Sequence, residues 1–266
     1  MYPEAMNSSN TLEEEFGALL NKVPRLNNRR SLTELSGGIT NRNLKVELPD
    51  GYCVARISSN SSELLSIDRN SEYHNSKLAA ESGCGAQVLD YLPGEGLLVI
   101  SFIEGKTFSA KDVENNLVRI AASCRALHSG KPFVRNFTMY ETQRNYLSIV
   151  QERGFKLPPN YLNFAPKMEE INKAMRVLDD GLVPCNNDLL PGNFIDGGNK
   201  IWLIDYEYSG NNDACFELGN IWAEAFLDYE RLEELVNAYY GERRPEKIAR
   251  AWLQALMAKY GWTLWA

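Results

Sequence analysis

The sequence predicts an α+β protein with two lobes, a small N-terminal lobe built on an antiparallel sheet (residues 1–104) and a larger, mainly helical C-terminal lobe (residues 105–266). Short alternating or β-branched apolar segments separated by turn residues dominate the first hundred positions. Longer helical stretches follow Glu104-Gly105, interrupted by one Gly-rich segment with two short apolar strands at residues 182–210. A sheet followed by helices is typical of α+β folds, and a cleft between two lobes commonly binds ligands.

The N-terminal lobe is predicted to begin with an amphipathic helix. Thr11 and Glu14 match a capping box, and apolar residues then recur at helical spacing through Val23. Pro49-Asp50-Gly51 supplies a turn inside the antiparallel meander that follows. In chain order, the elements predicted after the first helix are strands at residues 32–35, 43–48 and 52–57, a helix at 67–81, and strands at 87–91 and 97–103.

The C-terminal lobe shows the helical periodicity of apolar residues. Helices are predicted at residues 113–127, 168–178, 232–240 and 248–256. No internal repeat or low-complexity tract interrupts them.

Composition and charge exclude several classes of protein. The 266 residues carry 28 basic and 35 acidic side chains, a net charge of -7, so no overall positive field attracts nucleic acid. No window approaches the roughly 18 uninterrupted apolar residues of a membrane span, and the N-terminus lacks the features of a secretion signal. Five widely spaced cysteines without a C-x-x-C pair indicate reduced thiols. We therefore expect a cytoplasmic protein; its oligomeric state has no signal in the sequence.

Three short side chains with oxygen atoms mark the 182–210 segment as a candidate catalytic region. Asn193 lies five positions after Asp188, and Asp205 ends an apolar strand twelve positions later. In phosphoryl transfer, one carboxylate accepts the proton of the attacking hydroxyl, while an amide oxygen and a second carboxylate bind Mg²⁺ on the nucleotide phosphates. An isolated Asp-x-x-x-x-Asn is more often a loop with local hydrogen bonds, so the spacing alone leaves both readings open.

The sequence motifs around these residues resemble those of a known family. "CNNDLLPGNF" is similar to the catalytic loop, and "LIDYEYSG" to the metal-binding segment, of the choline/ethanolamine kinase family, a branch of the aminoglycoside-phosphotransferase-like kinases. The resemblance implies a bilobal protein-kinase-like fold and a kinase that uses ATP and Mg²⁺. It further implies that Asp188 is the catalytic base and that Asn193 and Asp205 bind the metal.

The resemblance extends into the N-terminal lobe. It implies that this lobe binds the nucleotide. In "ELSGGITNRNLKV" a loop would lie over the phosphates, and in "CVARI" Arg56 would contact the phosphates with Glu72 orienting it. The run "LVISFIEG" would be the hinge beside adenine. Each has a plain structural alternative: a connecting turn, surface charges and a core strand. The residues implied in the loop and hinge are Gly37, Gly38, Ile39, Thr40, Asn41, Ser101, Phe102 and Ile103.

The resemblance also implies a pocket for a small cationic alcohol. Its positions are Glu224 and Tyr229 after the metal-binding segment, and Trp262 and Trp265 in the final "KYGWTLWA". Aromatic faces attract a quaternary ammonium that cannot donate hydrogen bonds, and a spacing of three places both indoles on one helix face. A core helix would show the same pattern. Choline is therefore the first expectation, with ethanolamine, another small alcohol or an aminoglycoside as alternatives.

Two departures from the family pattern leave a further alternative open. Asn186 stands where the family usually has histidine, so we expect a less rigid catalytic loop with its chemistry retained. Family members generally continue for some tens of residues beyond the tryptophan pair, whereas this sequence ends at Ala266, so we expect a more open acceptor pocket. A catalytically impaired protein that binds nucleotide or choline is the corresponding alternative. For His128, and for Asp213 and Glu217, structural roles are at least as good an expectation as functional ones.

Overall fold

The computed structural model describes residues 9–36, 40–58, 65–177 and 179–265. Its N-terminal part is an antiparallel sheet of five strands in the order β1-β2-β3-β5-β4. The three-stranded meander, the helix and the two strands that follow confirm the predicted order of elements. The strands are β1 (Ser31–Leu35), β2 (Asn41–Leu48), β3 (Gly51–Ser58), β4 (Val88–Leu92) and β5 (Leu97–Ser101).

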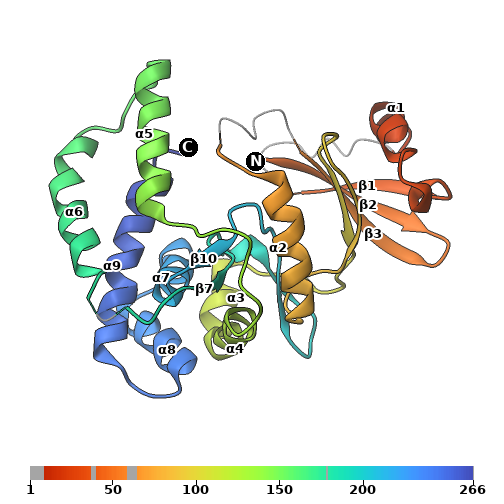
Figure 1. Cartoon of the computed structure of the whole chain (residues 1–266). Helices are drawn as coiled ribbons and strands as arrows, with labels where there is room; N and C mark the ends of the chain where they lie inside the picture. Colours follow the sequence, from red (N-terminus) through yellow and green to blue (C-terminus); the bar gives the residue numbers. More distant parts are fainter. Residues whose placement is uncertain (1–8, 37–39, 59–64, 178, 266) are drawn as a thin grey trace.

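Two helices accompany this sheet (Figure 1). Helix α1 (Ser9–Leu20) buries Leu12 and Leu20 in one cluster with Leu44 and Val46 of β2. Because α1 begins before Thr11, that residue lies inside the helix and does not cap it. Helix α2 (Arg69–Glu81) is capped by Asp68, whose carboxylate accepts hydrogen bonds from the backbone N–H groups of its first turn. A short 3-10 helix, η1 (Pro24–Leu26), connects α1 to β1.

Helices dominate the remainder of the chain and form the other half of the molecule in Figure 1. Their apolar faces build a core from α3, α4, α7 and α8, and a second cluster joins α5, α7 and α9. The helices are α3 (Ala110–Asn115), α4 (Leu117–His128), α5 (Met139–Arg153), α6 (Ala165–Ala174), α7 (Ala214–Glu224), α8 (Tyr229–Tyr240) and α9 (Pro245–Trp262), with 3-10 turns η2 (Tyr161–Phe164) and η3 (Pro191–Asn193).

Short strands lie between these helices, and most of them belong to the candidate catalytic segment at residues 182–210. β8 and β9 form a hairpin extended by β6, and β7 pairs with β10. The two apolar strands predicted in the 182–210 segment are therefore present. The strands are β6 (Lys106–Thr107), β7 (Val183–Cys185), β8 (Phe194–Asp196), β9 (Ile201–Leu203) and β10 (Gly210–Asn212).

The prediction of one continuous helix over residues 113–127 is wrong, because the helix is interrupted at Asn116 and the segment forms two helices, α3 and α4. Asn116 has φ −128° and ψ 22°, outside the helical region, and separates α3 from α4. Its side-chain amide donates to the Asp112 carbonyl at 2.8 Å and its amide oxygen accepts from Arg119 at 2.9 Å. A polar side chain that bonds locally in this way competes with the helical backbone ladder. Helix α3 instead starts at Ala110, directly after Ser109, which forms a capping box with Asp112.

Candidate active site

The three oxygen-bearing residues singled out in the sequence converge on one cavity. Asp188 follows β7, Asn193 ends the 3-10 turn η3, and Asp205 follows β9. Two turns of chain therefore bring together residues that are separated by up to seventeen positions. The cavity is lined by Thr40, Asp188, Leu190, Asn193, Asp205, Glu207, Tyr208, Glu224, Trp262 and Trp265.

Asn186 joins the catalytic loop to the segment that carries Asp205. Its side-chain nitrogen donates to the carbonyl oxygens of Ile204 at 3.1 Å and Asp205 at 2.9 Å. Its side-chain oxygen accepts from the backbone N–H of Asp188 at 3.1 Å. An amide has both a donor and an acceptor, and Asn186 is fully buried, so these bonds hold the two segments in fixed relation. The departure from histidine thus leaves a connection between the two segments.

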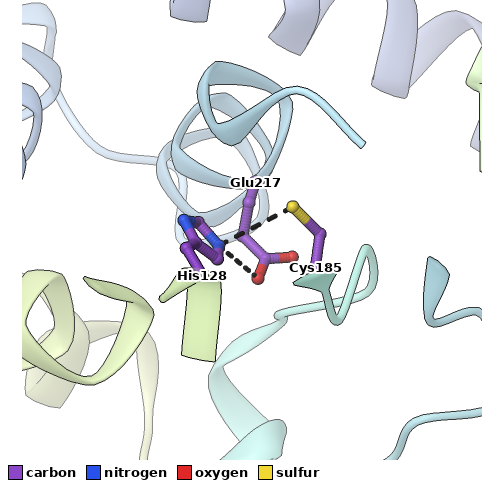
Figure 2. A group of neighbouring side chains, drawn as sticks. All are labelled: His128, Cys185 and Glu217. Atoms are coloured by element: carbon purple, nitrogen blue, oxygen red, sulfur yellow. Dashed lines mark hydrogen bonds and ion pairs between the residues drawn. The ribbon is translucent and has the colours of Figure 1, made fainter. Parts of the chain in front are cut away.

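A second buried group, shown in Figure 2, also supports this loop. Glu217 of α7 accepts hydrogen bonds from the backbone N–H of Asn186 at 3.0 Å and of Asn187 at 2.6 Å. Asn187 has φ 70°, a left-handed conformation that asparagine tolerates better than most residues. The Glu217 carboxylate fixes the backbone at this left-handed position. It therefore helps to set the position of the next residue, Asp188.

His128 and Cys185 complete the group in Figure 2, with ligand atoms of the three side chains within 4.8 Å of one another. His128 Nε2 lies 3.2 Å from Glu217, which only accepts, so Nε2 carries the proton; Nδ1 lies 2.8 Å from the Tyr239 hydroxyl. Burial raises the pKa of the Cys185 thiol well above its ordinary value. The set is satisfied by hydrogen bonds and a protonated thiol, so it supports the loop rather than forming a metal centre.

The carboxyl group of Asp188 lies in an acidic environment. Its pKa is raised well above the ordinary value, first by burial and then by the negative charges of Asp205, Glu207 and Glu224. A carboxylate with a raised pKa is a stronger base. Its position on the cavity wall therefore suits proton acceptance from a bound hydroxyl group.

Arg56 connects the sheet to the metal-binding segment. Its guanidinium donates to Asp205 at 2.6 Å and to Glu72 of α2 at 3.1 Å. Burial opposes the charge, but the carboxylates of Asp205 and Glu72 outweigh it and hold the pKa of Arg56 above its ordinary value. The predicted pair of Arg56 and Glu72 is thus present in space, with Asp205 as a third member.

Glu207 is a cavity residue that sequence reasoning missed. Its carboxylate accepts from the Thr40 hydroxyl at 2.9 Å and the Asn41 amide at 3.0 Å, and lies 3.3 Å from the Arg69 guanidinium. Burial and the charge of Asp205 raise its pKa. The signal was available in the acidic repeat Asp-Tyr-Glu of "LIDYEYSG", where Glu207 follows Asp205 by two positions.

The other residues predicted to contact the nucleotide lie in different places. Gly37, Gly38 and Ile39 lie outside the described residues. Thr40 lines the cavity, while Asn41 begins β2 beside it. The three hinge residues lie outside the lining of this cavity: Ser101 ends β5, and Phe102 contacts Tyr52, with ring centroids 6.0 Å apart. The predicted strand to residue 103 therefore ends two residues early, and Ile103 lies outside the strand.

Aromatic side chains also line the cavity. Trp262 is the last residue of α9, and Trp265 follows in the turn after the helix, so both indoles reach the cavity although only one is helical. Tyr208, which was not predicted as a pocket residue, contacts both of them. Its ring stands edge-on to Trp262 at 4.9 Å, and its hydroxyl accepts from Trp265 Nε1 at 2.7 Å. The Tyr146 hydroxyl lies 3.4 Å from the same oxygen.

The two predicted acceptor residues of residues 216–230 differ in their positions. Glu224 ends α7 and lines the cavity, where its carboxylate pairs with Lys259 at 2.8 Å. Tyr229 begins α8, is 50% exposed and is not among the residues that line this cavity. Asp213 caps α7 and pairs with Arg250, a structural role.

The oxygen donors fit a divalent magnesium ion. Asn193 donates from its amide nitrogen to the Asp188 carbonyl at 2.7 Å, which turns its amide oxygen toward other partners. Asp205 and Glu207 add carboxylates on the same cavity. Amide and carboxylate oxygens are the ligands that Mg²⁺ prefers, and soft sulfur ligands are absent from this lining.

Comparison with known proteins finds a matching family model and several relatives of similar sequence. A model of the family "choline/ethanolamine kinase" matches residues 32–260. Protein LicA of Haemophilus influenzae is 28% identical over 216 residues, which are 76% of this chain and 61% of LicA. Ethanolamine kinase 2 of Mus musculus is 27% identical over 265 residues, covering 86% of this chain and 67% of the mouse protein. This chain thus spans about three fifths of the length of the LicA protein.

A solved structure extends the likeness to three dimensions. The crystal structure of a choline/ethanolamine kinase family protein from Mesorhizobium loti matches with a TM-score of 0.83 and 29% identity, covering 96% of this chain and 85% of that one. The predicted bilobal α+β fold is therefore confirmed. Within the residues that the structure describes, none of the helices is both long and apolar enough to cross a membrane.

Proposed function

The chain belongs to the choline/ethanolamine kinase family, and on this premise we propose that it phosphorylates the hydroxyl group of choline with ATP and Mg²⁺, giving phosphocholine. One observation carries the proposal. The residues expected to perform phosphoryl transfer, Asp188, Asn193 and Asp205, line the same cavity as the aromatic wall of Trp262 and Trp265. A cationic alcohol held by that wall would present its hydroxyl to Asp188.

Asp188 would act as the catalytic base. Its raised pKa suits acceptance of the proton as the choline oxygen attacks the terminal phosphorus of ATP. Asn193 and Asp205 would hold Mg²⁺, which neutralises charge on the nucleotide phosphates. Arg56 would face the phosphates, with Glu72 orienting its guanidinium at 3.1 Å. The hydrogen bonds of Asn186 and Glu217 keep the loop in place before substrate arrives.

The acceptor wall favours a quaternary ammonium. Tyr208, Trp262 and Trp265 present aromatic surfaces, and each cation-π contact contributes roughly 0.5 to 2 kcal/mol. Glu224 adds a negative charge on the same cavity. Ethanolamine is the second candidate, because its primary ammonium would donate hydrogen bonds to the Glu224 carboxylate. A cytoplasmic location is part of the proposal, supported by five cysteines that are all free and buried.

The proposal is tested by ADP release with choline, ethanolamine and an aminoglycoside. We expect the highest kcat/KM with choline, and loss of turnover with retained MgATP binding in Asp188→Asn. Trp265→Ala should raise the KM for choline about two- to thirty-fold, the range of one lost cation-π contact. Trp252→Ala is the matched control, because Trp252 lies on α9 with 42% of its surface exposed, away from the cavity lining.

Equal background ADP release with every alcohol would refute the kinase function. A preferred aminoglycoside with a KM indifferent to Trp265→Ala would refute the choline pocket and keep the kinase. Binding of MgATP or choline without any turnover would identify the impaired binding protein instead.

A further inference from the structure

Lys259 pairs with a carboxylate that lines the same cavity as Trp262 and Trp265. Its Nζ atom lies 2.8 Å from Glu224 Oε1, and Glu224 lines the cavity. Lys259 lies on α9 one turn before Trp262, on the same helix face. The protein therefore holds a cation of its own at the edge of the site where a cationic alcohol would bind.

Phe226 also contacts this lysine. The Lys259 ammonium lies 4.9 Å from the centroid of the Phe226 ring, within the range of a cation-π contact. Phe226 is 84% exposed and has φ 53°, a left-handed conformation that is strained for a bulky aromatic residue. A strained and solvent-exposed ring beside an ammonium group is a local feature that core packing does not explain. Lys259 thus contacts a carboxylate and a ring at once.

The two candidate cations respond differently to this arrangement. A primary ammonium loses its hydration shell on binding and regains the energy by donating hydrogen bonds to acceptors such as a carboxylate. A quaternary ammonium donates none, keeps its nitrogen further from the carboxylate, and depends more on aromatic faces. Competition for Glu224 Oε1 therefore weakens a primary ammonium more than a quaternary one.

We propose that Lys259 is a specificity-determining residue, which by pairing with Glu224 biases the acceptor cavity against primary-ammonium alcohols and toward quaternary ones. The inference rests on the proposed function in one respect, that this cavity binds a cationic alcohol. It adds a residue outside the cavity lining that sets which cation is preferred.

The test compares choline and ethanolamine in Lys259→Met, which removes the charge and keeps the length of the side chain. The kcat/KM for ethanolamine relative to choline should rise about two- to five-fold, the range expected for an exposed ion pair, since the Lys259 side chain is 42% exposed. The change should appear in KM with kcat unaltered. Lys259→Arg keeps the charge and should retain the original preference.

A matched control uses the same substitution at a distant exposed pair. Lys167→Met removes the partner of Glu170 on α6 and should leave the ratio unchanged. In a Glu224→Gln background, Lys259→Met should no longer alter the ratio, because no carboxylate remains to be released. Melting temperatures verify that the variants are folded.

Calorimetric titration of the two amino alcohols reports the same preference without turnover, so a failure of catalysis does not block the test. A ratio unchanged in Lys259→Met, or shifted toward choline, overturns the role of Lys259 and leaves the kinase proposal standing. Absence of both binding and turnover with either alcohol overturns both proposals.

Discussion

At the scale of single residues, Asn186 shows how a side chain shorter than histidine connects the catalytic loop to the segment that carries Asp205. Its amide bonds the backbone of Ile204 and Asp205 with one end and that of Asp188 with the other. The loop therefore differs from the usual family pattern in chemistry while the connection between the base and the metal ligand remains. The rigidity of the catalytic loop therefore depends on which backbone atoms the side chain at position 186 joins.

Asn186→Ala should lower kcat much more than it changes the KM of either substrate. Three buried hydrogen bonds disappear, and carbonyl and N–H groups lose their partners, which lowers the free energy of unfolding by about 1 to 3 kcal/mol. Urea denaturation and steady-state kinetics measure the two effects. Asn186→His should raise kcat less than about three-fold, because the existing amide already makes these bonds. A gain of a hundred-fold would show instead that the natural loop is impaired.

Sequence reasoning singled out Asp188, Asn193 and Asp205 because the motifs around them resemble those of a known family, whereas their spacing alone left a plain loop as the alternative. Glu207 was missed although it follows Asp205 by two positions, because the motif does not show which residues Glu207 contacts. Its hydrogen bond to Thr40 joins residues 167 positions apart, and a periodic pattern carries no trace of such a contact. Tyr208 was missed likewise, since only the fold places its hydroxyl beside Trp265.

At the scale of elements, the sheet was easier to predict than the helices. Alternating apolar residues and the turn at Pro49-Asp50-Gly51 locate β2 and β3 to within two residues. Helix α5 was not predicted, because its buried face includes Gln143 and Tyr146, whose polar atoms weaken the apolar periodicity. Helix α9 extends beyond the predicted 248–256 at both ends. Tertiary packing decides such boundaries.

The contact between α7 and α9 depends on the absence of a side chain at Gly219. A Cβ atom at that position would overlap the carbonyl oxygen of Ala251 on α9. The two helices end at Glu224 and Trp262, which both line the acceptor part of the cavity. The close approach therefore sets the distance between the carboxylate and the indole.

Gly219→Ala should separate these helices and weaken acceptor binding. We expect a loss of about 1 to 3 kcal/mol in the free energy of unfolding from overpacking, together with a raised KM for the alcohol. Denaturant titration and kinetics measure both. Gly241→Ala is the matched control: Gly241 has φ 77° after α8, so alanine there costs stability while the cavity stays intact. Equal KM values in the two variants would contradict the argument.

At the scale of the whole molecule, charged side chains join the sheet to the helical part. Arg56 pairs with Asp205, and Glu207 accepts hydrogen bonds from Thr40 and Asn41. These contacts involve residues that we propose to bind the metal and the phosphates. Ligand binding must therefore alter interactions between the two halves.

MgATP should raise the melting temperature by roughly 5 to 10 °C at a concentration a hundred times its Kd, because a ligand that binds only the folded state stabilises it. ATP with EDTA should give a smaller rise. Asp205→Asn should abolish the difference between the two conditions. Asp196→Asn is the matched control, since Asp196 pairs with Arg119 at the surface hairpin, and it should preserve that difference. A metal-dependent rise that persists in Asp205→Asn would contradict the assignment of this ligand.

The bonds from Thr40 and Asn41 to Glu207 also bear on the timing of the catalytic cycle. They join residues at the start of the first hairpin to the segment that carries Asp205, so a nucleotide whose phosphates displaced the Glu207 carboxylate would have to break them and let them form again in every cycle. Departure of ADP, rather than the chemical step, would then limit turnover. Pre-steady-state mixing would show this as a burst of phosphorylated product followed by a slower linear phase.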